Sequence, residues 1–295
     1  MHLHRLFLVA GLILATAANA AELPGFKLDG TKWIYSDDQL SISGILIKPE
    51  GNGPFPAIVI SHGRGGNADG FGMAKARDFV KMGFVCIATS YTHAGPIGGA
   101  NANEGARGKA GGPGRGQKGQ AAEGAARDGA TSGVATPKAG TPPTGGTNFG
   151  ASEENLKRAS KCIDILASLP YVDTKRIAAY GNSMGAFITG VLGAKETDRL
   201  RAAAFTAGGL SSRGGAGAEG QVNGVRVPML ILHGSTDTTV PPESSARFKE
   251  VLDRNKIPNE RHVFDGIGHN LHQQKADEVN ALMRAWFVKY GVLEK

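Results

Sequence analysis

Cysteine is scarce in this chain, which has two in 295 residues. Neither residue has the spacing of a metal ligand, so no metal site is predicted. Cys86 lies in the apolar run 84–88, and Cys162 stands beside Ile163 in a helical pattern. Both patterns are typical of buried thiols, and a disulfide between the two residues is the alternative.

Long apolar runs are missing beyond the first twenty residues. Within those twenty, a basic flank with Arg5 precedes the apolar run 6–15, and Ala18-Asn19-Ala20 follows it. The run is shorter than the roughly 20 residues that a membrane span needs, and small residues after it are typical of a signal-peptidase site. We therefore expect residues 1–20 to be a cleaved signal peptide. Residues 21–295 are then exported to a periplasm or the cell exterior, without stable membrane insertion.

Large apolar side chains are nearly absent from residues 95–150, where Ile97, Val134 and Phe149 are the exceptions. Such a segment cannot bury enough apolar surface to offset the entropy lost on ordering. We predict that it is a disordered or weakly ordered insertion into the domain 21–295. The Gly-rich stretch 208–224 is expected to form a second mobile loop.

Charge of one sign is only modestly in excess, at a net +7, and residues 95–150 carry six Lys or Arg against three acidic residues. This balance is typical of an ordinary soluble surface and predicts no specific nucleic-acid partner. No pattern in the sequence specifies an oligomeric state.

Apolar and β-branched runs recur along the rest of the chain. Region 33–47 nearly alternates around Asp37-Asp38, which predicts an antiparallel hairpin. The later runs are continuous, as expected for strands that are covered on both faces in a parallel sheet. They lie at 57–60, 84–88, 177–180, 202–206, 228–232 and 262–264.

Helical patterns, with apolar residues spaced by three and four, separate these runs. In 152–169 the buried face includes Leu156 and Ala159, and Ser152 is the expected N-cap. The alternation predicts an α/β fold, with a doubly wound, mostly parallel sheet flanked by helices and an N-terminal antiparallel hairpin. The other helices are expected at 73–82, 184–195, 243–254 and 275–290.

The pentapeptide Gly181-Asn182-Ser183-Met184-Gly185 matches the G-x-S-x-G nucleophile elbow. Because glycine makes up 44 of 295 residues, the motif is informative only in context. A strand-like run precedes it and a helix-like run follows. A turn between a strand and a helix is what lifts a serine hydroxyl above a sheet in this motif. We predict that Ser183 is a nucleophile.

A nucleophilic serine needs a base and an acid that orients the base. His269 lies in the loop before the last predicted helix, and Asp237 lies just past the run 228–232. The order Ser, Asp, His is the one expected for a serine on such an elbow. We predict His269 as general base and Asp237 as its acid. Asp265 is the rival acid, but four residues before His269 it is typical of a turn.

The loop 61–66 follows the run 57–60, where its backbone N–H groups are placed to face a developing oxyanion. His62 and His233 are interpreted as braces of turns at strand ends. His93 and Arg64 are candidates for lining a substrate pocket, and solvent-exposed loop positions are the alternative for both.

Four segments carry a resemblance to a known family: H-G-R-G-G, G-N-S-M-G, H-G-S-T-D and G-I-G-H, in this order. They resemble the α/β-hydrolase superfamily, most closely its dienelactone-hydrolase-like branch, over about residues 32–290 apart from the insertion. The resemblance implies that the backbone N–H groups of Met184 and Arg64 form the oxyanion hole. The namesake enzyme has cysteine where this chain has Ser183, so its enol-lactone substrate is not carried over.

Serine members of this branch resemble general esterases. The expected activity is hydrolysis of a small carboxylic ester through an acyl-enzyme, without a cofactor or metal. Two alternatives stay open. One is a serine peptidase similar to prolyl-oligopeptidase catalytic domains, and the other is a noncatalytic binding protein on the same fold, which would need none of the Ser, Asp and His in this order.

Overall fold

The computed structural model describes residues 23–95, 150–212 and 215–295. The predicted signal peptide and residues 96–149 of the predicted insertion lie outside the described residues. None of the helices within the described ranges is long and apolar enough to cross a membrane.

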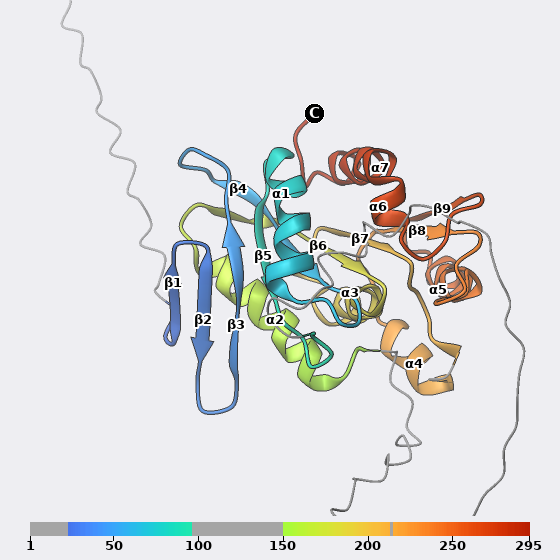
Figure 1. The fold of residues 1–295 in the computed structure, drawn as a ribbon, viewed down its shortest axis with the longest axis horizontal. Coiled ribbons are helices and arrows are strands. Elements are labelled where there is room, and N and C mark those ends of the chain that lie inside the picture. The colour runs from blue at the N-terminus through green and yellow to red at the C-terminus, as the bar shows by residue number, and fades with distance from the viewer. Residues whose placement is uncertain (1–22, 96–149, 213–214) are drawn as a thin grey trace, which may run out of the picture.

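A nine-stranded sheet runs through the described part of the chain, in the order β1-β2-β3-β5-β4-β6-β7-β8-β9. From β5 to β9 all neighbours are parallel, whereas β1, β2 and β3 form an antiparallel meander that joins β5. Figure 1 shows this meander at one side of the molecule and β9 at the other. The strands are β1 Phe26–Asp29, β2 Lys32–Ser36, β3 Ser41–Ile47, β4 Phe55–Ser61, β5 Val85–Thr89, β6 Val172–Asn182, β7 Ala202–Thr206, β8 Met229–Gly234 and β9 Asn259–Phe264.

Helices cover both faces of the sheet and bury two apolar cores. One core contains side chains of α2, α3, α4 and α5, and the other contains side chains of α1 and α7. A short π-helix precedes α1. The helices are η1 Ala68–Gly72, α1 Met73–Lys81, α2 Glu153–Ser168, α3 Met184–Lys195, α4 Gly215–Val222, α5 Glu243–Arg254, α6 Leu271–Gln274 and α7 Ala276–Lys289.

The continuous apolar runs serve both cores because successive side chains of a strand point to opposite faces. In β4, Ala57 and Val59 join the core under α2 and α3, whereas Ile58 and Ile60 join the core under α1 and α7. All four are fully buried. The predicted fold class is therefore confirmed, with parallel strands covered on both sides.

Several predicted elements have the observed bounds, and others need correction. The strand 202–206 and the helices 184–195 and 243–254 match β7, α3 and α5. The hairpin around Asp37-Asp38 is present, but an additional strand, β1, pairs with β2.

The prediction of a mobile loop over 208–224 is wrong in its second half, because α4 lies there. Ala218 and Val222, four residues apart, are fully buried and hold this Gly-rich helix on the core. Cys86 and Cys162 are free thiols, and both are buried.

Candidate active site

The predicted elbow is a tight turn between β6 and α3. Ser183 stands between them with φ 54° and ψ −119°, a conformation that costs a non-glycine residue on the order of 1–3 kcal/mol. Two backbone hydrogen bonds hold it. The Ser183 N–H donates to the Thr206 carbonyl at 3.0 Å, and the Ala186 N–H donates to the Ser183 carbonyl at 2.9 Å.

The two glycines of the motif are required by close backbone contacts. A Cβ on Gly181 would lie 2.2 Å from the Gly185 carbonyl oxygen, and a Cβ on Gly185 would lie 2.1 Å from the Ser61 carbonyl oxygen. The first oxygen belongs to α3 and the second to β4, so neither can move without shifting a helix or a strand. The turn therefore excludes any side chain at either position.

The structure brings the three predicted catalytic side chains into one hydrogen-bonded chain. His269 Nε2 lies 2.9 Å from Ser183 Oγ, and His269 Nδ1 lies 2.8 Å from Asp237 Oδ2. An ionised carboxylate only accepts, so Nδ1 carries the proton, and Nε2 is left to accept from the serine hydroxyl. Ser183 is 8% exposed and Asp237 is 3% exposed, so the polar chain opens to solvent mainly through His269.

Asp237 has more donors than a single histidine provides. Its Oδ1 accepts from the N–H groups of Thr239 and Val240, each at 2.9 Å. His233 Nε2 lies 3.2 Å from Oδ2. Burial by itself would raise the pKa of Asp237, but the hydrogen bonds from His233, His269 and the Val240 amide outweigh it and hold that pKa far below its usual range. The acid is therefore ionised wherever the protein is folded near neutral pH.

The loop after β4 lies against the serine. A Cβ on Gly63 would lie 3.0 Å from Ser183 Cβ, which leaves room for backbone only. The loop is fastened to the segment after β5, because Gly65 N–H donates to the His93 carbonyl at 3.1 Å and Gly95 N–H donates to the Gly66 carbonyl at 3.0 Å. The backbone of residues 63–66 is thus fixed beside the nucleophile.

His62 holds the base of this loop. Its Nδ1 lies 2.8 Å from the Gly63 carbonyl, which can only accept, so Nδ1 donates and Nε2 accepts from the Tyr91 N–H at 3.0 Å. Burial lowers the pKa of His62 to about 4, despite the opposing effect of the Gly63 hydrogen bond. The neutral ring therefore acts as a brace, as interpreted from the sequence.

The two residues predicted to line the pocket occupy different environments. His93 is partly buried and stacks on Tyr91, with ring centroids 5.7 Å apart, and its Nε2 lies 3.3 Å from the His62 carbonyl. Its Nδ1 lies 3.4 Å from Asn155 Nδ2. Arg64 is exposed. His93 is therefore fixed behind the loop, whereas Arg64 lies at its surface.

The rival acid lies elsewhere. Asp265 is exposed and accepts from Ser235 Oγ at 3.2 Å, and Ser235 Oγ in turn accepts from the Gly266 N–H. These bonds join the end of β8 to the surface turn that follows β9. They match the interpretation of Asp265 as a turn residue.

The structure also shows partners that sequence reasoning missed. Thr206 ends β7, and it both accepts from the Ser183 N–H and donates from Oγ1 to Asn182 Oδ1 at 2.8 Å. His233 contacts Asp237 as well as its own turn. Position at a strand end was the available signal for both residues, but it does not reveal which neighbour each one contacts.

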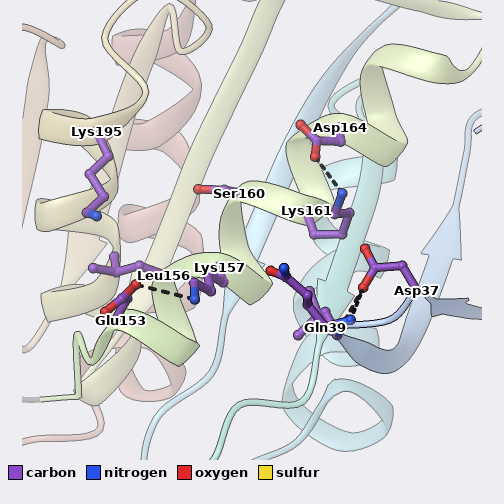
Figure 2. A pocket seen from close by; sticks show the side chains of 10 residues that line it. Asp37, Gln39, Glu153, Leu156, Lys157, Ser160, Lys161, Asp164 and Lys195 are labelled. Carbon is purple, nitrogen blue, oxygen red and sulfur yellow. Dashed lines mark hydrogen bonds and ion pairs between the residues drawn. The ribbon is translucent and has the colours of Figure 1, made fainter.

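A polar groove elsewhere on the surface is drawn in Figure 2. It is lined by the β2–β3 turn, by α2 and by the end of α3, and by none of the three residues of the hydrogen-bonded chain. Lys157 pairs with Glu153 at 3.3 Å, and Lys161 pairs with Asp164 at 3.0 Å. With these charges paired, the groove is a charged surface outside the candidate active site.

The fold and the strained serine define the class of protein. A doubly wound, mostly parallel sheet with a serine on a strand-to-helix turn is the α/β-hydrolase arrangement. Solved structures share it. Esterase 2 of Thermogutta terrifontis, phosphorylated by paraoxon, is 19% identical, with a TM-score of 0.58 over 93% of this chain and 97% of that chain. The same esterase with propionate bound is 19% identical, with a TM-score of 0.57 over 93% of this chain and 98% of that chain.

A Bacteroides ovatus protein described as a dipeptidyl aminopeptidase IV is also similar. It is 14% identical, with a TM-score of 0.60 over 88% of this chain, but the match spans 35% of that larger chain. At these identities the structures show the shared fold. A search of curated protein sequences returns no match.

Residues 42–290 match the model of the dienelactone hydrolase family. The match spans most of the chain, so the protein belongs to this family. A dienelactone is a cyclic ester, which makes the protein an ester hydrolase by family.

Proposed function

We propose that the protein hydrolyses small carboxylic esters through an acyl-enzyme formed on Ser183. The observation that carries the proposal is the continuous chain from Ser183 Oγ to His269 and on to Asp237, with donor-acceptor distances of 2.9 Å and 2.8 Å. Hydroxyl, imidazole and carboxylate in this order are the groups that activate a serine for acyl transfer.

In the acylation step, Ser183 Oγ attacks the ester carbonyl carbon while its proton passes to His269 Nε2. Asp237 keeps Nδ1–H oriented and stabilises the imidazolium that forms. The carbonyl oxygen becomes an oxyanion beside the Met184 and Arg64 N–H groups, which we propose as its donors. His269 then protonates the leaving alkoxide, and the alcohol departs.

In the deacylation step, a water molecule gives a proton to His269 and attacks the acyl carbon. The second tetrahedral intermediate collapses, the carboxylic acid leaves, and Ser183 Oγ regains the proton from Nε2. We place Arg64 at the rim of the substrate pocket. His93 contributes there through the loop that it fixes.

The similar structures guide the choice of substrate and probe. Esterase 2 of Thermogutta terrifontis has been solved phosphorylated by paraoxon and with propionate bound. By analogy, we propose that this chain accepts short acyl groups and that Ser183 reacts with organophosphorus esters.

A direct test compares p-nitrophenyl acetate with a Gly-Pro p-nitroanilide, because the latter probes the peptidase alternative suggested by the Bacteroides ovatus structure. We expect hydrolysis of the ester by the wild type and a loss of several orders of magnitude in the Ser183→Ala variant, with an unchanged circular dichroism spectrum. Preference for the anilide would favour a peptidase. A folded wild type that cleaves neither compound would favour the noncatalytic binding protein.

We also propose export, on the evidence of the basic flank, apolar run and small residues within positions 1–20. In a bacterial host, the mature protein recovered from the periplasm or medium should begin at Ala21. Recovery of full-length protein in the cytoplasm alone would contradict this proposal.

A further inference from the structure

The carboxylate of Asp237 lies between two imidazole rings. Its Oδ2 is 2.8 Å from His269 Nδ1 and 3.2 Å from His233 Nε2, while its Oδ1 is held by the amides of Thr239 and Val240. Orientation of a base requires only the first of these contacts. The second imidazole is therefore an additional component of the site.

The ring of His233 is completely buried at the end of β8, four residues before Asp237. Its Nε2 also lies 2.9 Å from the Val240 carbonyl oxygen. A carbonyl can only accept, so Nε2 carries the proton and donates to Val240 O, and Asp237 Oδ2 lies 3.2 Å from the same nitrogen. The tautomer of His233 is thus fixed by the turn that Asp237 itself begins.

Two hydrogen bonds and one close contact form a closed ring. Asp237 Oδ1 accepts from the Val240 amide, the Val240 carbonyl accepts from His233, and the same His233 N–H reaches back to Asp237 Oδ2. Rotation of the carboxylate about its χ2 bond would break contacts on both oxygens. The Oδ2 atom is therefore held where His269 meets it.

We propose that His233 is a positioning residue for the reaction at Ser183, in that its Nε2–H fixes the Asp237 carboxylate in the orientation that aligns His269. The inference rests on the proposed function. It differs from a role as a turn brace, because a brace needs the bond to Val240 alone.

The proposal has a kinetic consequence as well as a structural one. A carboxylate with one donor fewer attracts a proton on the His269 ring more strongly. Loss of the His233 donor should therefore move the acid limb of the kcat/KM profile to higher pH. The other titratable groups that act on this region are His272 of α6, which interacts electrostatically with His269, and Lys75 of α1, which acts on His272. Both are unchanged by a substitution at position 233.

The experiment compares His233→Leu with His233→Gln. Leucine removes the donor, whereas the glutamine amide restores one near the position of Nε2. With p-nitrophenyl acetate we expect His233→Leu to lower kcat about 10- to 100-fold at nearly constant KM, as for a small misplacement of a catalytic group. The acid limb should move to higher pH. His233→Gln should recover most of kcat and return the limb toward the wild-type position.

The matched control is His262→Leu on the neighbouring strand β9. The His262 side chain is 39% exposed and lies 3.5 Å from Glu260, so its loss should leave kcat and the pH profile unchanged. A His233→Leu variant that is less stable but keeps the wild-type kcat and acid limb would overturn the proposal and leave only the brace.

A double-mutant cycle with Asp237→Asn tests whether His233 acts through the carboxylate. We expect the double variant to have the activity of Asp237→Asn within about twofold, because there is no carboxylate left to position. Multiplicative losses would contradict the inference. Should His233→Leu not fold, ¹⁵N NMR of the wild type provides the decision: Nε2–H with bare Nδ1 is required, and the opposite tautomer overturns the proposal.

Failure of the proposed function has a different signature. In that case the wild type does not cleave the ester, or the Ser183→Ala variant cleaves it as fast as the wild type. The inference about His233 fails, and the proposed function stands, when the wild type is an esterase that depends on Ser183 and His233→Leu has the same kcat and acid limb.

Discussion

At the scale of single residues, the site depends on a serine whose backbone is strained and on neighbours that hold it. The φ of 54° is stabilised from both sides, by the Thr206 carbonyl that accepts the Ser183 N–H and by the Ala186 amide that donates to the Ser183 carbonyl. Such strain persists only where surrounding contacts determine the conformation. Here it points Oγ at His269 and keeps the hydroxyl off the helix that follows.

The identity of the acid is tested by two matched substitutions. Asp237→Asn should lower kcat by about 10,000-fold, because an amide in place of the carboxylate favours the wrong tautomer of His269. Asp265→Asn should have little effect, since Asp265 contacts Ser235 on the surface. Steady-state kinetics of both variants provide the measurement. A large loss in Asp265→Asn with a near-normal Asp237→Asn would reassign the acid.

At the scale of elements, the turn between β6 and α3 requires glycine at positions where a side chain would collide with the backbone. Gly185→Ala would place a methyl group 2.1 Å from the Ser61 carbonyl oxygen and 2.5 Å from its carbon, so α3 and β4 must separate. We expect a loss of several kcal/mol of unfolding free energy together with activity, by analogy with overpacked cores. Urea unfolding followed by circular dichroism is the measurement.

Gly220→Ala in α4 is the control for that substitution. A Cβ at Gly220 has no atom within 4 Å, so alanine should raise the unfolding free energy by about 0.4–1 kcal/mol through the entropy of the unfolded chain. Equal stability changes in Gly185→Ala and Gly220→Ala would show that the elbow tolerates a side chain.

Prediction of helices and strands from the sequence succeeded where the apolar pattern was clear. It failed where a high glycine content hid the apolar pattern of a helix. The bounds of α5 were predicted because apolar residues spaced by three and four form its buried face, and those of α3 because a continuous apolar run follows the serine turn. The helix α4 was missed because its residues Gly215, Gly217 and Gly220 suggest a loop, and burial of Ala218 and Val222 outweighs their low helix propensity.

The same limit applies to the candidate site. Motif order placed Ser183, Asp237 and His269 each after the carboxyl end of a strand, and the structure puts them within hydrogen-bonding distance. The contact of His233 with Asp237 depends on the geometry of the turn that ends at Val240, which no local pattern encodes.

At the scale of the whole molecule, buried histidines link stability to pH. Burial lowers the pKa of His62 to about 4, and burial with the charges of Lys75 and His269 lowers the pKa of His272 to about 3, from an ordinary value of 6.5. Burial also lowers the pKa of the partly buried His93. Below pH 6.5 the unfolded chain therefore binds protons that the folded chain does not bind. Their contribution to stability is complete above that pH and declines as the pH falls toward 4.

We expect the free energy of unfolding to fall between pH 6.5 and 4.5, with a limiting slope of about 1.4 kcal/mol per pH unit for each histidine. Urea titrations at pH 7, 5.5 and 4.5 measure it. His272→Leu should make the slope shallower, whereas His262→Leu, at a partly exposed position, should leave it unchanged. Stability that is constant over this range would contradict the assignment of buried, neutral histidines.

The central claim is that Ser183 is the nucleophile of an acyl-transfer site, and the most direct test is covalent labelling. The wild type is treated with a fluorophosphonate, digested and mapped by mass spectrometry. We predict one label per chain, on the peptide containing Ser183, and loss of ester hydrolysis in proportion to labelling. His269→Ala should label far more slowly, since Nε2 lies 2.9 Å from the hydroxyl that it activates. A label on another residue, or an active enzyme with Ser183 unmodified after full reaction, would contradict the account.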